Sequence, residues 1–367
     1  MLPNPRPFAS RGTSRGAALV ACAWLAGACP LAGVAAEQDP AGRRQQERLD
    51  EANRKEGEAL LRLADAAMAG RPVSADFPLA WRNDFLKAQP GTFVPFTITI
   101  DRAKVSAPTV LMYVRAVRRR STEQRSAFDA IFPVDVQEDP GQPIRITRGF
   151  AVAPGDYDVY VAVRERPRDP LAVRQRQLKA AVLKQPLSVP DFWTGELATS
   201  SIMLANRLDV IAGSVSPDEL LERPYVIGQH EAEVNFDGRF RRTGELVVVF
   251  LIYNPTVTPD KHFDLQVDYH LFERAGPGEP PGAARDTGDH PPARPGERYV
   301  SRTNPQRFNP DAMGGLYDGS ADRPVLAGQG IPLSSFHQGE YRLGITVTDL
   351  LSRKTLSRDV TFTVVGS

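Results

Sequence analysis

The chain has 367 residues, and its 45 Lys and Arg residues nearly balance its 44 Asp and Glu residues, so the net charge is +1. Such a balance gives no overall electrostatic attraction to nucleic acid, and that class of partner is not expected. The length suits two domains better than one. With only two cysteines in the chain, disulfide bonds are not the basis of the fold.

The first 36 residues have the pattern of a secretory signal peptide. Arg6, Arg11 and Arg15 precede an uncharged, alanine-rich run over residues 17–36, and the small residues at its end indicate cleavage before Glu37. We therefore expect a secreted or periplasmic protein. A retained transmembrane anchor is the alternative, because the run is just long enough to span a bilayer.

Cys22 and Cys29 both lie within this leader. After cleavage the mature chain would have no disulfide, no zinc thiolate and no cysteine nucleophile. Leu19–Cys22 resembles a bacterial lipobox, which would make Cys22 a lipidated first residue. We favour ordinary cleavage because the apolar stretch before Cys22 is short, and we expect membrane attachment only with lipidation or a retained leader.

A helical spacer is predicted over residues 37–72. Good helix formers dominate this segment, and its apolar residues recur at steps of three and four. Gly70, just before Pro72, marks the end of the helix. We interpret the segment as a spacer or as a helix that docks on its neighbour. A coiled-coil oligomerisation arm is the alternative, with an apolar stripe of only about three heptads, and the oligomeric state stays open.

The remainder predicts an all-β protein with two tandem immunoglobulin-like β-sandwiches. The first is expected over residues 73–206 and the second over residues 224–367, with a linker at 207–223. Alternating stretches such as Thr92–Ile100 indicate strands that are half buried. The uninterrupted apolar run Leu246–Tyr253 predicts a central strand that is covered on both faces.

Two further segments complete this division of the chain. Leu197–Leu204 is expected to close the first sandwich, and a Pro- and Gly-rich insertion occupies residues 275–330 of the second. A loop of that length is either functional or disordered, and the composition of its first half predicts disorder. The second half is expected to pack against the sandwich and to be the first place to look for a partner site, because it contains Tyr299, Phe308, Met313, Leu316 and Tyr317.

One short signature occurs in both predicted sandwiches. Gly155 and Tyr157 open one alternating strand, and Gly339 and Tyr341 open another. A glycine two residues before a tyrosine at the start of such a strand is typical of a tyrosine corner, in which the phenol bonds backbone upstream. These four residues are structural candidates, and no catalytic residue is assigned.

Two segments have residue types that bind metals. His262, Asp264, Gln266, Asp268 and His270 alternate with apolar residues and would share one strand face. Neighbouring side chains on that face are about 6.6 Å apart, so a metal would need ligands from a second strand, and we favour a solvated sheet face. Residues 318–322 resemble the start of a calcium loop but lack its later glycine and glutamate. We expect no cofactor and no stoichiometric zinc, manganese or calcium.

Arginines are concentrated where two predicted strands end. If the two strands ran in the same direction, their arginines would form one patch able to attract anionic lipid, polysaccharide or nucleic acid. Acidic residues are interspersed and no aromatic residues alternate with the arginines, so we favour solvated loops. The two sets are Arg115, Arg118, Arg119, Arg120 and Arg125, and Arg164, Arg166, Arg168, Arg174 and Arg176.

Several segments resemble a known group of proteins. They are Phe150 with Pro154, Phe336, Leu187–Phe192 and Ser200–Leu204. These segments are similar to the β-sandwich part that accompanies a von Willebrand factor A-related domain in secreted acidobacterial proteins, although no A domain is evident in this chain. The resemblance implies an exported or envelope β protein and provides no catalytic residue.

We therefore expect a non-catalytic scaffold or protein-interaction protein of a bacterial envelope, with another envelope protein or a polysaccharide as its partner. A carbohydrate-binding module protein is the first alternative, and clustered exposed Trp or Tyr side chains would favour it. A metal-dependent hydrolase is the second, and it would need His262 or His270 to meet carboxylates from another strand. The sequence contains no Gly-x-Ser-x-Gly, phosphate-loop or His-Glu-x-x-His motif.

Overall fold

The computed structural model describes residues 40–89, 91–119, 126–136, 141–166, 178–213, 215–275, 290–313 and 323–366, with side chains from residue 51 onward. The predicted signal peptide lies outside this part. Residues 52–367 form one compact unit, and the contacts below lie within it. None of the helices in the described part is both long and apolar enough to cross a bilayer.

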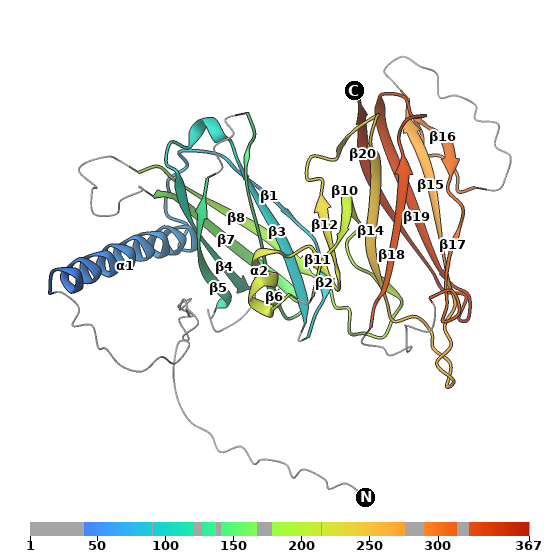
Figure 1. The fold of residues 1–367 in the computed structure, drawn as a ribbon, viewed down its shortest axis with the longest axis horizontal. Coiled ribbons are helices and arrows are strands. Elements are labelled where there is room, and N and C mark those ends of the chain that lie inside the picture. The colour runs from blue at the N-terminus through green and yellow to red at the C-terminus, as the bar shows by residue number, and fades with distance from the viewer. Residues whose placement is uncertain are drawn as a thin grey trace, which may run out of the picture. The chain divides into compact units, whose positions relative to one another are not determined.

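Strands dominate the described part of the chain, and the first two sheets come from its N-terminal half (Figure 1). Sheet A has the strand order β5-β4-β7-β8, with bounds Ser126–Asp135, Thr109–Arg118, Gly155–Arg166 and Ala180–Val189. Sheet B has the order β1-β3-β2, and β6 also pairs with β3; the bounds of β1, β3, β2 and β6 are Leu79–Asn83, Thr92–Ile100, Leu86–Lys87 and Ile144–Val152. A short 3-10 helix, η1 (Arg102–Lys104), follows β3.

The other two sheets come from the C-terminal half. Sheet C has the order β11-β12-β10-β14-β18, with β9 also paired to β14; in that order the bounds are Val226–Ile227, His230–Val234, Met203–Val210, Glu245–Tyr253, Val325–Pro332 and Ala198–Thr199. Sheet D has the order β13-β20-β19-β15-β16, with β17 also paired to β15; the bounds are Arg239–Arg241, Thr355–Val365, Gly339–Asp349, Leu265–Arg274, Glu297–Arg302 and Gln306–Phe308. Helix α2 (Pro217–Glu222) lies in the connection from β10 to β11.

Sheets A and B enclose one hydrophobic core, and sheets C and D enclose a second. Alternation along each strand produces both cores: Tyr157, Val159 and Val161 of β7 point into the first, and Leu343, Ile345 and Val347 of β19 point into the second. Two sheets around one core are the arrangement of a β-sandwich. The all-β class is thus confirmed, and the assignment of these pairs to the immunoglobulin-like class stays a prediction.

A third hydrophobic cluster, which we call the junction core, joins sheet B to sheet C. Its buried members are Leu86, Phe192, Met203, Ala205, Tyr225, Ala232, Val234, Val249, Leu251 and Tyr253. Strand β14 therefore lies between two cores: Leu246, Val248, Phe250 and Ile252 point toward sheet D, and the alternate residues point toward sheet B. This confirms the prediction that Leu246–Tyr253 is covered on both faces, and it supplies the reason.

The predicted boundary between the two sandwiches is wrong. The sequence predicts residues 197–206 in the first sandwich and 207–223 in a linker, but β9 and β10 both pair with β14 of sheet C, and β10 also pairs with β12 as far as Val210. The chain therefore passes from sheet A to sheet C between Val189 and Ala198. Met203, Leu204 and Ala205 are all buried. Their apolar sequence pattern therefore indicates a buried strand, but it does not indicate to which sheet that strand belongs.

Helix α1 (Pro40–Met68) stops just before Gly70, as predicted, and Gly70 has a φ of +67°. Its second half docks on sheet A, where Leu60 and Ala64 are fully buried in a cluster with Leu111, Tyr113 and Ala162. Arg115 of β4 donates to Asp65 of the helix at 2.8 Å. The segment is therefore a helix that docks on its neighbour, which is one of the predicted possibilities.

The predicted insertion at residues 275–330 is not one long loop. It contains β16 and β17 of sheet D, and β18 of sheet C begins within it at Val325. Phe308 and Met313 pack against the core between sheets C and D, and Tyr299 contacts Phe272, as expected for the second half. Residues 276–289 and 314–322, which include Leu316 and Tyr317, lie outside the described part.

Candidate functional site

Tyr157 and Tyr341 occupy matching positions in the two sheet pairs. Tyr157 is 1% exposed and its hydroxyl donates to the carbonyl of Ala153 at 2.8 Å. Tyr341 is 2% exposed and donates to the carbonyl of His337 at 2.9 Å. Each acceptor lies four residues upstream, which is the hydrogen bond that a tyrosine corner makes.

The two glycines of the signature differ. Gly155 has a φ of +140°, and a Cβ there would lie 2.9 Å from the guanidinium of Arg118, so glycine is required. Gly339 has no positive φ, and the nearest side-chain atom to a Cβ would be 3.8 Å away. The second glycine is therefore not explained by backbone strain.

Replacing Tyr157 by Phe should destabilise the protein by about 1 to 3 kcal/mol, because the ring stays buried while the carbonyl of Ala153 loses its donor. Tyr341→Phe should cost a similar amount, because its single hydroxyl proton is shared between the carbonyl of His337 and the carboxylate of Glu273, 3.2 Å away. Urea unfolding of the two variants measures both effects. Unchanged unfolding midpoints would refute the assignment of these tyrosines as structural corners.

The predicted polar face around His262 and His270 is not a solvated strand face. Strand β15 begins only at Leu265, after a turn in which Lys261 has a φ of +62°, so His262 and Asp264 are not in the strand. Asp264 is 8% exposed, and Arg307 of β17 donates to its carboxylate at 2.8 Å. His270 is 7% exposed. The prediction failed at Asp264 and His270, because side chains of neighbouring strands, Arg307 of β17 and Tyr299 of β16, lie against them; Gln266 and Asp268 are half-exposed.

His270 is the least satisfied polar side chain of this face. Its Nδ1 is buried and has no hydrogen-bond partner among the described residues. Burial lowers the pKa of the imidazole, and Asp268 opposes this effect, so His270 is neutral at pH 7. Within the described part of the chain, no three His, Cys, Asp or Glu side chains lie together as metal ligands would. The metal content of the protein stays a prediction, and residues 318–322 lie outside the described part.

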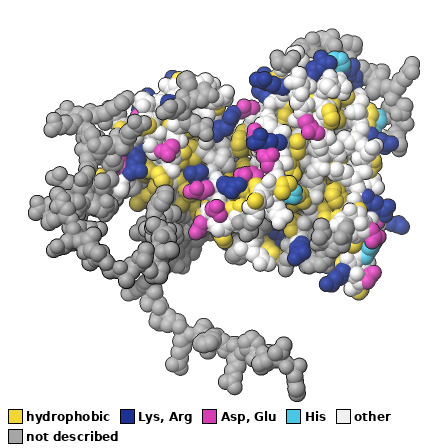
Figure 2. Space-filling view, in the orientation of Figure 1, with side chains coloured by type: hydrophobic (Ala, Val, Ile, Leu, Met, Phe, Trp, Pro, Cys, Tyr) yellow, Lys and Arg dark blue, Asp and Glu magenta, His cyan; other side chains and the backbone are white. Residues whose placement is uncertain are grey.

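The two predicted sets of arginines do not form one patch. Strands β4 and β7 are antiparallel, with Arg118 opposite Tyr157 and Arg166 opposite Thr109, so the sets leave the sheet at opposite ends. Arg119 donates to Asp158 at 2.7 Å, and Arg166 lies 2.9 Å from Glu56. Basic and acidic side chains intermingle in Figure 2. Arg120, Arg125, Arg168, Arg174 and Arg176 lie outside the described part.

An ionic cluster covers part of the outer face of sheet D. Arg342 of β19 lies over the ring of Phe272, with its guanidinium carbon 3.9 Å from the ring centroid, and it donates to Glu297 and Asp359 at 2.8 Å each. Hydrogen bonding from Arg342 lowers the pKa of Glu297. Arg294 also donates to Asp359. These groups satisfy one another, so the cluster fixes the backbone of β16 and offers no reactive side chain.

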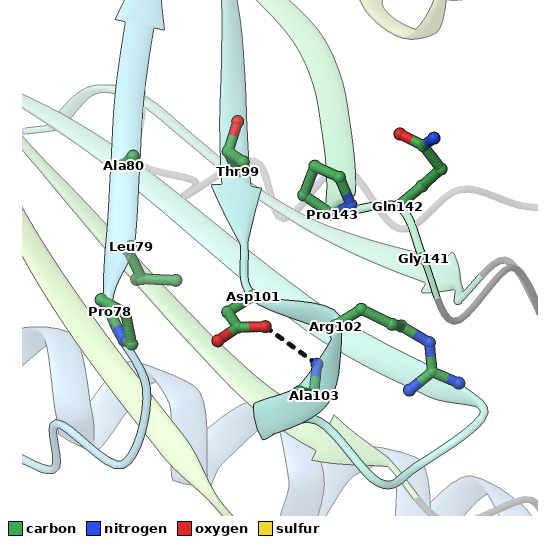
Figure 3. Close-up of a pocket in the computed structure, with 10 residues that line it drawn as sticks. All are labelled: Pro78, Leu79, Ala80, Thr99, Asp101, Arg102, Ala103, Gly141, Gln142 and Pro143. Carbon is green, nitrogen blue, oxygen red and sulfur yellow. Dashed lines mark hydrogen bonds between the residues drawn. The ribbon is translucent and has the colours of Figure 1, made fainter.

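A hollow of 460 Å³ lies at the ends of β1, β3 and β6 (Figure 3). One carboxylate oxygen of Asp101 accepts from the backbone N–H of Ala103 at 3.0 Å and thereby caps η1. Figure 3 shows Arg102 directed away from that carboxylate. The lining is Pro78, Leu79, Ala80, Thr99, Asp101, Arg102, Ala103, Gly141, Gln142 and Pro143. It places no acid, base or nucleophile in a catalytic arrangement.

A smaller hollow of 300 Å³ surrounds Trp193, beside the junction of sheets B and C. The indole is 39% exposed, and its N–H donates to the carbonyls of Ala88 and Gly91 at 3.2 and 3.0 Å. The ammonium of Lys87 lies 4.1 Å from the ring centroid, which is a cation-π contact. The hollow combines an aromatic surface with a cation.

Hydrogen bonds of the segment Asp84–Lys87 add specificity to the junction. The hydroxyl of Tyr225 donates to the carboxylate of Asp84 at 2.8 Å, the N–H of Phe85 donates to Ser201 Oγ at 2.9 Å, and the N–H of Lys87 donates to the hydroxyl of Tyr253 at 3.0 Å. Asp84 is 5% exposed. Burial raises its pKa, while Tyr225 and the charge of Arg82 oppose the increase.

Asp84→Asn should leave the protein as stable as the parent at pH 7, or more so, because an amide oxygen still accepts from Tyr225 and no charge is buried. The raised pKa means that the folded parent binds a proton more tightly than the unfolded chain does. The parent should therefore gain stability relative to Asp84→Asn as the pH falls from 7 toward the ordinary value of 3.8. Urea unfolding at pH 7 and pH 4.5 measures this difference.

Asp237→Asn is the matched control for that experiment. Asp237 pairs with Arg145 across the same junction at 2.7 Å, and its side chain is 59% exposed, so removing this charge relieves no burial. If the difference in unfolding free energy between the parent and Asp84→Asn does not change with pH, the argument that burial raises the pKa of Asp84 is contradicted.

No protein-family model matches this chain, and no curated protein matches it significantly. The resemblance to secreted von Willebrand factor A-related proteins thus stays a prediction.

Proposed function

We propose that this protein is an exported, non-catalytic scaffold or protein-interaction protein of a bacterial envelope. The observation that carries the proposal is the junction core, which joins two sheet pairs into one body. Domains on a flexible linker move relative to each other by default. Here buried apolar side chains and three hydrogen bonds from the segment Asp84–Lys87 oppose such motion.

A rigid body of this kind is suited to holding partners. Its outer surfaces keep fixed positions, so binding a partner loses little conformational entropy. The partner is another envelope protein or a polysaccharide, and nucleic acid is not expected. The proposed export rests on the leader at residues 1–36, and the mass of the protein recovered from the envelope fraction tests it: a chain beginning at Glu37 is expected.

The proposed function can be tested in the bacterium that encodes the chain. The full protein is cross-linked in intact cells, and any captured envelope protein is then purified and titrated against it by calorimetry. Saturable binding at a defined stoichiometry supports the proposal. Turnover of an envelope substrate by the purified protein, or no saturable protein or polysaccharide ligand at all, would overturn it.

Carbohydrate binding is the second candidate function, and the hollow at Trp193 favours it. An exposed indole beside Lys87 and Gln89 provides a stacking surface with nearby hydrogen-bond donors. The other described tryptophan, Trp81, stacks on Phe96 with centroids 4.7 Å apart, and Tyr253 is 2% exposed. Trp193 is therefore not part of an aromatic cluster. If the parent protein binds a glycan and Trp193→Ala does not, carbohydrate binding becomes the preferred function.

A further inference from the structure

Strand β20 has an open edge in the described part of the chain. One edge pairs with β19 from Thr355 to Val364. The other edge pairs only with β13, and only over Thr363–Val365. Residues 355–362 thus form an edge without a neighbouring strand among the described residues. The strand ends at the C-terminus marked in Figure 1.

Hydrogen-bond alternation identifies which backbone groups face this open edge. The N–H of Thr363 points away from β19, because it donates to the carbonyl of Gly238 at 2.7 Å. In an antiparallel pair the backbone groups of alternate residues point to the same side. Thr355, Ser357, Asp359 and Thr361 therefore direct their N–H and C=O groups toward the open edge, which makes eight backbone groups available to an added strand.

Three other edge strands, β8, β5 and β18, carry features that hinder the addition of a strand. Strand β8 contains Pro186, and one end is covered because Val182 donates to the carbonyl of Ser74. Strand β5 contains Pro133, and β18 contains two glycines and ends at Pro332. Strand β20 is 11 residues long and contains neither proline nor glycine. The edge strands β1 and β16 also lack proline and glycine, but they are only five and six residues long, so β20 offers the longer edge for pairing.

The side chains of β20 indicate what an added strand would contain. On the sandwich side, Leu356 and Val360 are half-buried against the core between sheets C and D. Arg358 lies between them, is exposed, and donates to the carbonyl of Ser357 at 3.2 Å. Arg358 has no carboxylate partner among the described residues. On this side of the sheet, an added strand beside β20 would lie next to an apolar residue (Leu356), then a basic residue (Arg358), then a second apolar residue (Val360).

A second copy of the chain fits this edge poorly. The symmetric antiparallel pairing that uses all four open residues is centred on Arg358. It places Arg358 opposite its own copy and Leu356 opposite Val360. Like charges directly opposite each other destabilise a strand pair, and Arg358 gains no acidic partner. A different polypeptide with an acidic residue at the position opposite Arg358 fits better.

We propose that the open edge of β20 binds an extended segment of a partner protein as an added strand. The segment has the alternating pattern apolar-x-acidic-x-apolar, with the acidic residue opposite Arg358 and the apolar residues extending the faces of Leu356 and Val360. This inference rests on the proposed function and names the class of partner. Backbone hydrogen bonds provide affinity, and the alternate side chains provide specificity.

Synthetic peptides test the proposal on the full protein. The probe is a nine-residue peptide with the core Val-Thr-Glu-Thr-Val, and its counterpart carries Lys in place of Glu. Fluorescence anisotropy should show at least tenfold tighter binding of the Glu peptide. Arg358→Glu should reverse this preference, and as an exposed charge reversal it should leave the fold intact.

Two proline variants test the backbone contribution. Ser357→Pro and Thr361→Pro remove N–H groups that face the open edge and do not bond β19, so both should abolish peptide binding. Ser188→Pro makes the same change at the edge of β8 and should not affect binding. Equal binding of the Glu and Lys peptides, or binding that survives both edge prolines, would overturn the proposal.

The failures of the two proposals are distinguishable. If a cross-linked partner binds the protein while no peptide binds β20, the edge inference is wrong and the scaffold function stands. If no saturable ligand is found, the scaffold function fails. Dimerisation that Ser357→Pro abolishes would also overturn the inference, because it would make a second copy the occupant.

Discussion

Replacing Leu86 by Asp is expected to uncouple the two sheet pairs. Leu86 is 6% exposed and belongs to the junction core, not to either of the other two cores. A carboxylate there is buried without a partner, which costs several kcal/mol, about 3 or more. This loss of free energy destabilises only the contact between the two sheet pairs and leaves their own cores intact. Each pair should then unfold separately, so calorimetry should show two unfolding transitions in place of one cooperative transition.

Val300→Asp is the control for this experiment. Val300 lies on β16 and is 39% exposed, so an added carboxylate stays in water and one transition should remain. If Leu86→Asp also unfolds in a single transition at the temperature of the parent, the junction does not couple the sheet pairs and the rigid-body argument fails.

The second large effect is expected for Asp349→Ala, at the last residue of β19 before the turn to β20. Asp349 is 1% exposed. One carboxylate oxygen accepts from the N–H groups of Leu351 and Ser352 at 3.0 and 3.1 Å, and the other accepts from the N–H of Thr256 at 2.8 Å. Alanine leaves three donors without their acceptor, so the loss should be about 3 to 6 kcal/mol. Equilibrium urea unfolding measures it.

The same site predicts a dependence on acid. Burial raises the pKa of Asp349, but hydrogen bonds from Thr256 and Ser352 outweigh it, so the net pKa lies below 3.8. The charged group therefore stabilises the fold at neutral pH, and that contribution is lost as the pH falls through the lowered pKa. Asp349→Asn keeps the shape and one acceptor, so it should lose less than Asp349→Ala. Equal losses in the two variants would contradict this account.

Local patterns were sufficient to predict part of the fold. Period-two alternation predicted the all-β class, and the helix formers before Gly70 predicted α1. The run Leu246–Tyr253 predicted a strand covered on both faces, although nothing in it identified what covers each face. The sheet to which Met203–Ala205 belongs could not be predicted, because a segment that is apolar on both faces fits either sheet pair.

The candidate sites depend on contacts between residues that are distant in the sequence. Asp84 and Tyr225 are 141 residues apart, and neither has a local pattern that marks it as buried and paired. The arginine sets separated because β4 and β7 are antiparallel, a relation that the sequence did not reveal. The open edge of β20 is defined by the lack of a neighbour in the described chain, and no pattern within β20 predicts that.

The position of β14 between two cores affects how such a protein can evolve. A module that is copied or moved between genes must be able to fold in a new context, so its outer surfaces must tolerate water. Sheet C does not meet this condition, since Val249, Leu251 and Tyr253 would become exposed if residues 190–367 were expressed alone. Such a fragment should aggregate unless sheet B accompanies it, so we expect the two sheet pairs to be inherited together as a single unit.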